Sequence, residues 1–411
     1  MQMVTNRYEI CRQEMESRLR ERIDFTREVS DEEIQGIIDD LMLGEWHKYA
    51  LTLEERKSLA KEIFYDVRRL GILQELMDEE DITEIMINGA GDIFYEKQGG
   101  LYRWDKSFES QEKLEDVIQQ IVSKCNRTVN EASPIVDARL GDGSRVNIVL
   151  SPIALNGPVV TIRRFPENPI TMGQLISFDS VSAEAAEFLK KLVMAGYNIF
   201  ISGGTGSGKT TFLNALSHYI PNTERIITIE DSAELQIRGV SNLVSLETRN
   251  ANTEGVKEIS IRDLIKASLR MRPDRIIVGE VRGAEAIDML QALNTGHDGS
   301  LSTGHANSAR DMLARLETMV LMGMELPLAA VRAQIASGVD IIVHLGRLRD
   351  GTRKVLEIAE ITGYDKEEIH TQSLYRYEET GEEEGRILGV LQKENELYHT
   401  QKLSAAGLCE L

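Results

Sequence analysis

The fold of this chain is decided by the stretch Ile199-Phe200-Ile201-Ser202-Gly203-Gly204-Thr205-Gly206-Ser207-Gly208-Lys209-Thr210-Thr211. It reads as a short apolar strand, a glycine-rich turn and the start of a helix. The turn matches the pattern G-x-x-x-x-G-K-[ST], with Gly203, Gly208, Lys209 and Thr210 at the fixed positions. A chance match is the weaker interpretation, because the strand before the loop and the helix after it are the context that the pattern requires.

Each part of this loop suits a nucleotide. Glycines let consecutive backbone N–H groups face one anion, and the helix expected from about residue 209 to residue 217 offers its positive end to phosphate. Lys209 can reach the β- and γ-phosphates, and the Thr210 hydroxyl can ligate Mg²⁺. We therefore expect ATP and Mg²⁺ as ligands. The loop residues expected to bind them are Gly203, Gly204, Thr205, Gly206, Ser207, Gly208, Lys209, Thr210 and Thr211.

The composition narrows the kinds of protein that this chain can be. The chain has 411 residues, of which 42% are hydrophobic and 28% charged, as in a soluble globular protein of two or three domains. Its net charge of −20 argues against wholesale binding to nucleic acid. The three cysteines form no CxxC pair, so a zinc module is not expected. We find no apolar run of transmembrane length and no signal peptide, and we expect a cytoplasmic protein whose membrane role is peripheral.

The patterns change along the chain in three steps. Residues 1–71 are predicted to form a helical N-terminal segment, and residues 72–167 an α+β domain of short strands around one helix. Residues 168–411 alternate apolar strands with helices, which predicts a doubly wound, largely parallel α/β sheet. Pro166 and Pro169 flank the polar break at which we place the domain boundary.

Two segments are expected to be solvated. Residues 8–23 are rich in Arg and Glu and show little apolar face, so we expect either a solvated helix or a tail that seeks a partner. Near the end of the chain, Gly381 and the acidic residues 382–384 are expected to form a turn in a solvated loop.

Hydrolysis of a nucleotide also needs carboxylates. The strand Arg275-Ile276-Ile277-Val278 is followed by Gly279 and Glu280, the arrangement called Walker B. A parallel strand delivers its last residue to the crevice where ligands bind, so we expect Glu280 to act in catalysis and to bind the metal ion. The alternative, a surface glutamate after a core strand, is disfavoured by the nucleotide loop upstream.

A second apolar strand, residues 226–229, ends in Glu230 and Asp231. Either carboxylate could orient or deprotonate the attacking water. The sequence leaves open whether Glu230, Asp231 or Glu280 is the general base, and at least one of the pair after this strand could be structural instead.

Two histidines share a polar loop. His297 and His305 lie in a stretch rich in Gly, Ser and Thr, residues 295–305. A lone histidine is more often structural, but two in such a loop favour a sensor of the phosphate state over a metal site.

Arginines gather on the strands before the boundary, at Arg139, Arg145, Arg163 and Arg164. Each alone would be read as a solvated or salt-bridged side chain. As a group in a chain with a nucleotide loop, they are candidates for neutralising charge on the phosphates. Arg270, Arg272 and Arg282, which flank the Walker B strand, are candidates of the same kind.

These motifs together resemble the type II/type IV secretion ATPase superfamily. In that family they are the Walker A, Asp box, Walker B and His box, which here are residues 203–210, 229–231, 269–282 and 295–307. Residues 82–89 and 134–147 resemble the N-terminal domain of the CpaF-type branch, which powers assembly of Flp/tight-adherence pili. No tetracysteine module of the kind seen in many type II secretion ATPases is present in the sequence, which argues against that branch.

The resemblance implies a RecA-like P-loop ATPase domain and a homohexameric ring at the cytoplasmic face of the membrane. It implies that ATP sits between the N-terminal and C-terminal domains, and that hydrolysis drives an inner-membrane platform protein of a pilus or secretion system. Arg139 and Arg145 fall where the family's N-terminal arginines approach the phosphates.

Three other functions remain open. A retraction or conjugation ATPase of the same superfamily is the nearest alternative. A DNA-stimulated, recombinase-like ATPase suits the sheet but not the net charge of −20. A non-catalytic nucleotide-binding regulator is disfavoured because Lys209 and Glu280 are both present.

Overall fold

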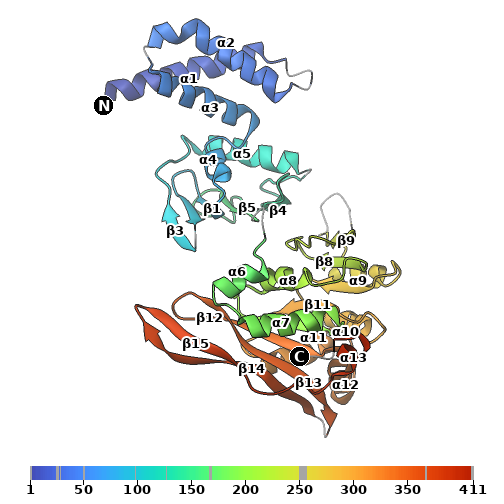
Figure 1. Cartoon of the computed structure of the whole chain (residues 1–411). Helices are drawn as coiled ribbons and strands as arrows, with labels where there is room; N and C mark the ends of the chain where they lie inside the picture. The colour runs from blue at the N-terminus through green and yellow to red at the C-terminus, as the bar shows by residue number, and fades with distance from the viewer. Residues whose placement is uncertain are drawn as a thin grey trace. The chain divides into compact units, whose positions relative to one another are not determined.

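The structure is a computed structural model that describes residues 2–24, 27, 29–49, 51–97, 99–125, 127–165, 169–249, 257–365 and 368–408. The chain divides into two compact units, Met1–Glu167 and Asn168–Leu411 (Figure 1). Pro166, at the break expected from the sequence, lies outside the described residues. Among the helices that are described, none combines the length and the apolar character needed to cross a bilayer.

The first unit begins with helices that share a core. They are α1 (Gln2–Arg22), α2 (Asp31–Tyr49) and α3 (Leu53–Arg68). In α1 the side chains of Cys11, Met15 and Leu19 recur every four residues and are buried in that core. The expectation of a solvated helix over residues 8–23 is therefore wrong, because this narrow apolar stripe is enough to pack α1 against α2 and α3.

The rest of the first unit is an α+β fold. Helices α4 (Leu73–Asp78) and α5 (Gln111–Lys124) pack on an antiparallel sheet whose order in the described part is β3-β2-β1-β6-β5-β4. Its strands are β1 (Ile82–Asn88), β2 (Ile93–Lys97), β3 (Gly100–Arg103), β4 (Ile135–Arg139), β5 (Arg145–Val149) and β6 (Val159–Arg163). Arg139 pairs with Arg145, and Arg145 with Arg163, across adjacent strands. The three arginines therefore project from one face of the sheet.

The second unit is built on one large sheet, whose described strands run in the order β15-β14-β13-β12-β7-β11-β10-β8-β9. The parallel part comprises β7 (Ile199–Gly203), β8 (Arg225–Glu230), β9 (Asn242–Glu247), β10 (Arg275–Val278), β11 (Leu301–Gly304) and β12 (Ile341–Arg347). An antiparallel extension follows, with β13 (Arg353–Asp365), β14 (Glu368–Glu383) and β15 (Arg386–Lys393).

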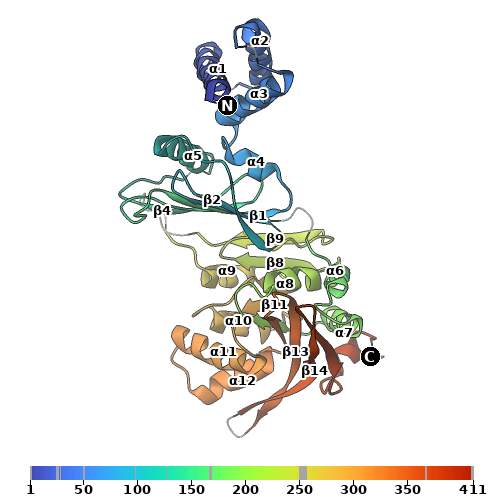
Figure 2. The same cartoon turned by 90° about the vertical axis from the view of Figure 1, so that its left-hand side faces the viewer.

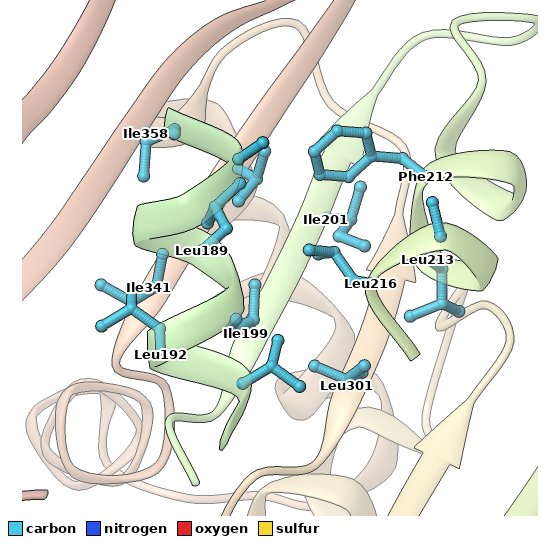
Figure 3. Close-up of a cluster of buried hydrophobic side chains, with 14 of the residues drawn as sticks. Leu189, Leu192, Ile199, Ile201, Phe212, Leu213, Leu216, Leu301, Ile341 and Ile358 are labelled. Atoms are coloured by element: carbon cyan, nitrogen blue, oxygen red, sulfur yellow. The ribbon is translucent and has the colours of Figure 1, made fainter. Parts of the chain in front are cut away.

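Helices cover both faces of this sheet (Figure 2). One face carries α6 (Met172–Ser177), α7 (Ala183–Met194), α8 (Lys209–Ser217) and α13 (Gln401–Ala405). The other carries α9 (Ile261–Ser268), α10 (Ala286–Leu293), α11 (Ala309–Gly323) and α12 (Leu328–Gly338). Ile199 and Ile201 of β7 point to the first face, among side chains of α7 and α8 (Figure 3), and Phe200 points to the second. The doubly wound, largely parallel sheet predicted from the sequence is confirmed.

The antiparallel extension was not predicted, and it corrects one expectation. The turn and loop expected at Gly381 and residues 382–384 fall mostly within strand β14, which runs to Glu383. The register between β14 and β15 shifts between Glu379 and Gly381, so the glycine marks a bulge inside the strand rather than its end. The chain reverses at Glu384 and Gly385, which both have positive φ.

Candidate functional site

The predicted chemistry gathers at one edge of the sheet in the second unit. Strands β7, β11, β10 and β8 are neighbours and parallel, so all four end at the same edge. The glycine-rich loop of residues 203–208, which we call the phosphate loop, begins at the last residue of β7. His305 follows β11, Glu280 follows β10 and Asp231 follows β8. Ligands of open α/β sheets bind outside this edge.

The glycine-rich loop is held open by its backbone conformation. Gly208 has a φ of 93° and caps the N-terminus of α8, a conformation that favours glycine. A Cβ on Gly203 would lie 2.5 Å from the carbonyl oxygen of Leu345 on β12, so only glycine fits between the two strands. Residues 204–206 form the exposed tip of the loop, and Thr210 and Thr211 lie in the first turn of α8. This turn presents the N–H groups of a helix terminus.

The Lys209 ammonium is folded back onto its own loop. Its Nζ donates hydrogen bonds to the carbonyl oxygens of Gly203 (3.1 Å) and Gly204 (2.9 Å) and lies 3.2 Å from Nδ1 of His305. Burial lowers the pKa of Lys209, and the negative charge of Glu280 opposes that shift. The ammonium is therefore positioned at the loop by weak carbonyl acceptors, which a phosphate oxygen can replace.

His305 stands between Lys209 and Glu280. Burial, followed by the charge of Lys209, lowers the pKa of His305, so the imidazole is neutral at physiological pH. An ammonium can only donate, so Nδ1 of His305 must accept and the ring proton resides on Nε2. That nitrogen lies 2.7 Å from Oε1 of Glu280. The histidine thus connects the loop lysine to the Walker B carboxylate.

The second oxygen of Glu280 is paired with an arginine. Oε2 of Glu280 accepts a hydrogen bond from Arg282 (2.5 Å), and Nη1 of Arg282 lies 3.6 Å from Oδ2 of the more exposed Asp231. Together with Lys209 and His305, these side chains form a continuous row across the four strand ends. We call this row, Lys209-His305-Glu280-Arg282-Asp231, the polar row.

Glu230 is placed differently from its neighbour Asp231. It is buried, and its Oε1 accepts hydrogen bonds from the backbone N–H groups of Glu234 (2.9 Å) and Leu235 (3.0 Å). Burial raises its pKa from 4.5 to about 7, although the two N–H groups act in the opposite direction. A carboxyl group with this pKa can both take up and release a proton near neutral pH.

His297 is not brought to this edge. It precedes β11, whereas His305 follows it, so the two histidines lie at opposite ends of that short strand. Nδ1 of His297 lies 3.0 Å from the carbonyl oxygen of Ala292 at the end of α10. Arg139 and Arg145 belong to the first unit, on β4 and β5.

The residues present fit a nucleotide and a magnesium ion. Oε1 of Glu280 is buried, and in the described part of the chain its contact with Nε2 of His305 at 2.7 Å does not complete a hydrogen bond of good geometry, so the oxygen retains capacity for a ligand. A carboxylate oxygen is the kind of ligand that Mg²⁺ takes alongside phosphate, and the charge of Glu280 acts on Lys209 at the start of α8, where Thr210 offers a hydroxyl. The Lys209 ammonium and the N–H groups of the first turn of α8 are donors that an anion at this edge could use.

One residue of the site was missed from the sequence. Arg353, the first residue of β13, donates from Nε to the carbonyl oxygen of Gly206 in the loop (2.8 Å). The residue lies far beyond the motifs that indicated the site, and a single arginine after a turn carries no signal of its own.

The fold and this edge define the class of RecA-like P-loop nucleotide-binding proteins. Within that class, the chain belongs to the type II/IV secretion system protein family, whose model matches residues 67–396.

Named relatives agree with this family. The chain is 34% identical to the type IV secretion system protein PtlH of Bordetella pertussis over 316 residues, which covers 70% of this chain and 93% of PtlH. It is 33% identical to the conjugal transfer protein TrbB of Rhizobium radiobacter over 307 residues, which covers 74% of this chain and 91% of TrbB.

Solved structures share the fold. The ATPase DotB of Legionella pneumophila matches with a TM-score of 0.50 and 20% identity, over 73% of this chain and 81% of DotB. The ATPase DotB of Yersinia pseudotuberculosis matches with a TM-score of 0.51 and 17% identity, over 72% of this chain and 78% of that protein.

The buried Glu230 predicts a pH dependence of stability. Between pH 4.5 and about 7 the folded chain holds a proton that the unfolded chain has lost, so the free energy of unfolding falls as the pH rises. Glu230→Gln removes this dependence and should be more stable than the wild type at pH 8, by up to about 3 kcal/mol, with no such gain at pH 4. Calorimetry is the suitable measurement, because both tryptophans, Trp46 and Trp104, lie in the first unit.

The matched control is Glu258→Gln, the same change at an exposed carboxylate of the second unit. It should leave the pH dependence as in the wild type. A Glu230→Gln variant with an unchanged pH dependence would contradict the protonation assigned to Glu230.

Proposed function

We propose that this protein is an ATP-hydrolysing motor that powers assembly of a pilus of the Flp/tight-adherence kind or protein secretion across the inner membrane. The observation that carries the proposal is the polar row, which joins the phosphate loop to two carboxylates across four neighbouring strand ends. A protein that only binds nucleotide needs the loop; hydrolysis also needs carboxylates for the metal ion and the water.

Within this proposal each side chain has a separate task. Lys209 exchanges its carbonyl acceptors for phosphate oxygens, and Thr210 and Glu280 hold Mg²⁺, which when bound would neutralise charge on the phosphates. His305 and Arg282 orient the Glu280 carboxylate from either side. Glu230 is our first candidate for the general base, because its pKa of about 7 suits proton uptake at neutral pH.

The partners follow from the family resemblance. We propose a homohexamer that associates peripherally with the cytoplasmic face of the inner membrane and acts on a platform protein there. The CpaF-type branch is supported by the upstream motifs at residues 82–89 and 134–147. A role in conjugation is the second candidate, favoured by the likeness to a conjugal transfer protein. Loss of pili, of secretion or of plasmid transfer in a deletion strain separates these roles.

We also propose that Arg139 and Arg145 supply positive charge to the nucleotide phosphates. Arg139, Arg145 and Arg163 are cross-strand neighbours, so their side chains place positive charge on one face of the sheet. Guanidinium groups are suited to phosphate, which they can contact with two donors at once.

Substitutions in the polar row should stop turnover. Lys209→Ala should nearly abolish ATP hydrolysis, and Glu280→Ala should lower kcat by at least about 100-fold while sparing ATP binding, because it removes charge stabilisation around the transferred phosphoryl group. Phosphate release and ATP binding by the full chain are the measurements. Lys190→Ala, at an exposed ion pair on α7, is the control. Wild-type turnover in Glu280→Ala would exclude the role assigned to that carboxylate.

Arg145→Ala should lower turnover more than it lowers stability, because the proposed role is in the reaction rather than in the sheet. The measurements are kcat and the melting temperature of the full chain. Arg103→Ala provides the matched control, since Arg103 is an exposed, ion-paired arginine on another strand of the same sheet. If turnover in Arg145→Ala stays at the wild-type level, Arg145 has no part in the site.

The nature of the partner can be tested through stimulation. ATP turnover of the full chain should rise when vesicles that carry the platform protein are added, and it should not rise with double-stranded DNA, because the net charge of the chain is −20. Stimulation by DNA alone would instead support the recombinase-like alternative.

A further inference from the structure

The phosphate loop is contacted from outside by a side chain of the antiparallel extension. Nε of Arg353 donates a hydrogen bond to the carbonyl oxygen of Gly206 at 2.8 Å. The Cδ atom of the same arginine would lie 3.5 Å from a Cβ on Gly208, so its stem packs over the last glycine before Lys209. One side chain therefore contacts the loop at two glycines whose φ angles are positive.

The strand that carries Arg353 is itself fixed. Lys354, buried on the opposite side of β13, donates from Nζ to the backbone oxygen (2.7 Å) and the carboxylate (2.6 Å) of Asp179. The N–H of Val355 donates to the carbonyl oxygen of Ser180 at 2.8 Å. Because successive residues of a strand point to opposite faces, anchoring Lys354 sets the direction of Arg353.

The turn before Arg353 is fixed as well. Oδ1 of Asp350 accepts hydrogen bonds from the N–H (2.9 Å) and the hydroxyl (2.6 Å) of Thr352. Oδ2 accepts from the N–H of Ile387 on β15 at 2.8 Å. The hydrogen bond from Ile387 holds the pKa of Asp350 down to about 2, so the carboxylate stays ionised at physiological pH. Asp350 thus ties the turn to the β14–β15 hairpin.

The structure assigns to Arg353 the role of a positioning residue that holds the phosphate loop in its nucleotide-binding form, with Asp350 fixing Arg353 in turn. The peptide between Gly206 and Ser207 is planar, so holding its carbonyl oxygen also fixes the direction of the Ser207 N–H. An anion nest depends on the directions of such N–H groups. The role rests on the proposed function, since it presumes that the loop binds a nucleotide.

A residue that only positions the phosphate loop should affect the affinity for the nucleotide. The loop contacts phosphate both before and after the reaction, so Arg353 should affect ATP and ADP alike and leave kcat nearly unchanged. Loss of one hydrogen bond from a charged donor corresponds to a roughly tenfold weaker affinity.

The test compares Arg353→Met with Arg353→Lys in the full chain. Arg353→Met should raise KM for MgATP and Kd for MgADP about tenfold, with the melting temperature in the absence of nucleotide as in the wild type. Arg353→Lys, which keeps a donor and the charge, should recover part of the affinity. Asp350→Asn, which leaves Arg353 in place, should give a smaller rise. Arg376→Met, at an exposed ion-paired arginine of β14, is the control and should change neither constant.

The outcomes separate this inference from the proposed function. A lower melting temperature with unchanged KM and Kd would mean that Arg353 is only structural and would overturn the inference. If Lys209→Ala abolishes turnover but Arg353→Met keeps wild-type KM, the inference fails and the function stands. If Lys209→Ala turns over normally, the proposed function itself is wrong. Should Arg353→Met not fold, an unchanged KM and Kd in Asp350→Asn overturns the inference.

Discussion

The whole site depends on the burial of one strand. Strand β7 pairs with β11 on one side and β12 on the other, and helices cover both of its faces. A strand enclosed in this way can neither slide nor twist without opening two cores, so the first glycine of the loop is fixed in space. The loop glycines give the proposed anion site its shape, and the surrounding sheet and helices hold that shape in place.

The charged side chains at the carboxyl ends of the four parallel strands stabilise one another, each acting on the next along the polar row. In the polar row, cations at Lys209 and Arg282 alternate with carboxylates at Glu280 and Asp231, and the neutral ring of His305 fills the one gap. A buried charge is costly unless it is paired, so Lys209 and the mostly buried Glu280 depend on their neighbours, whereas Arg282 and Asp231 at the other end of the row are exposed to solvent. A phosphate bound as proposed would compete for Lys209 and would thereby change the environment of Glu280, two side chains away in the row.

The sequence predicts those residues of the candidate site that belong to a short, recognisable pattern. The phosphate loop and Glu280 follow from glycine spacing and from a β-branched run that ends in an acid. The two histidines could not be told apart, because a strand of only four residues separates them and sends them to opposite edges of the sheet. The adjacent acids Glu230 and Asp231 differ because Glu230 is the last residue of the buried strand β8, whereas Asp231 lies just beyond that strand and is exposed. Arg353 could not be predicted, because it contacts the backbone carbonyl of Gly206 and such a contact leaves no pattern in the sequence.

The bulge at Gly381 has a consequence for how the protein behaves at high concentration. Strand β15 is an edge of the large sheet, and it exposes Leu388 and Val390, the composition that invites a foreign strand to pair. The bulge lies in β14, the strand that pairs with β15, and a bulge bends and twists the strand that contains it. Arg386 and Lys393 place positive charges at the two ends of β15 itself. By bending the strand on which β15 is paired, the bulge at Gly381 is expected to make this edge less flat and therefore less open to pairing with a foreign strand.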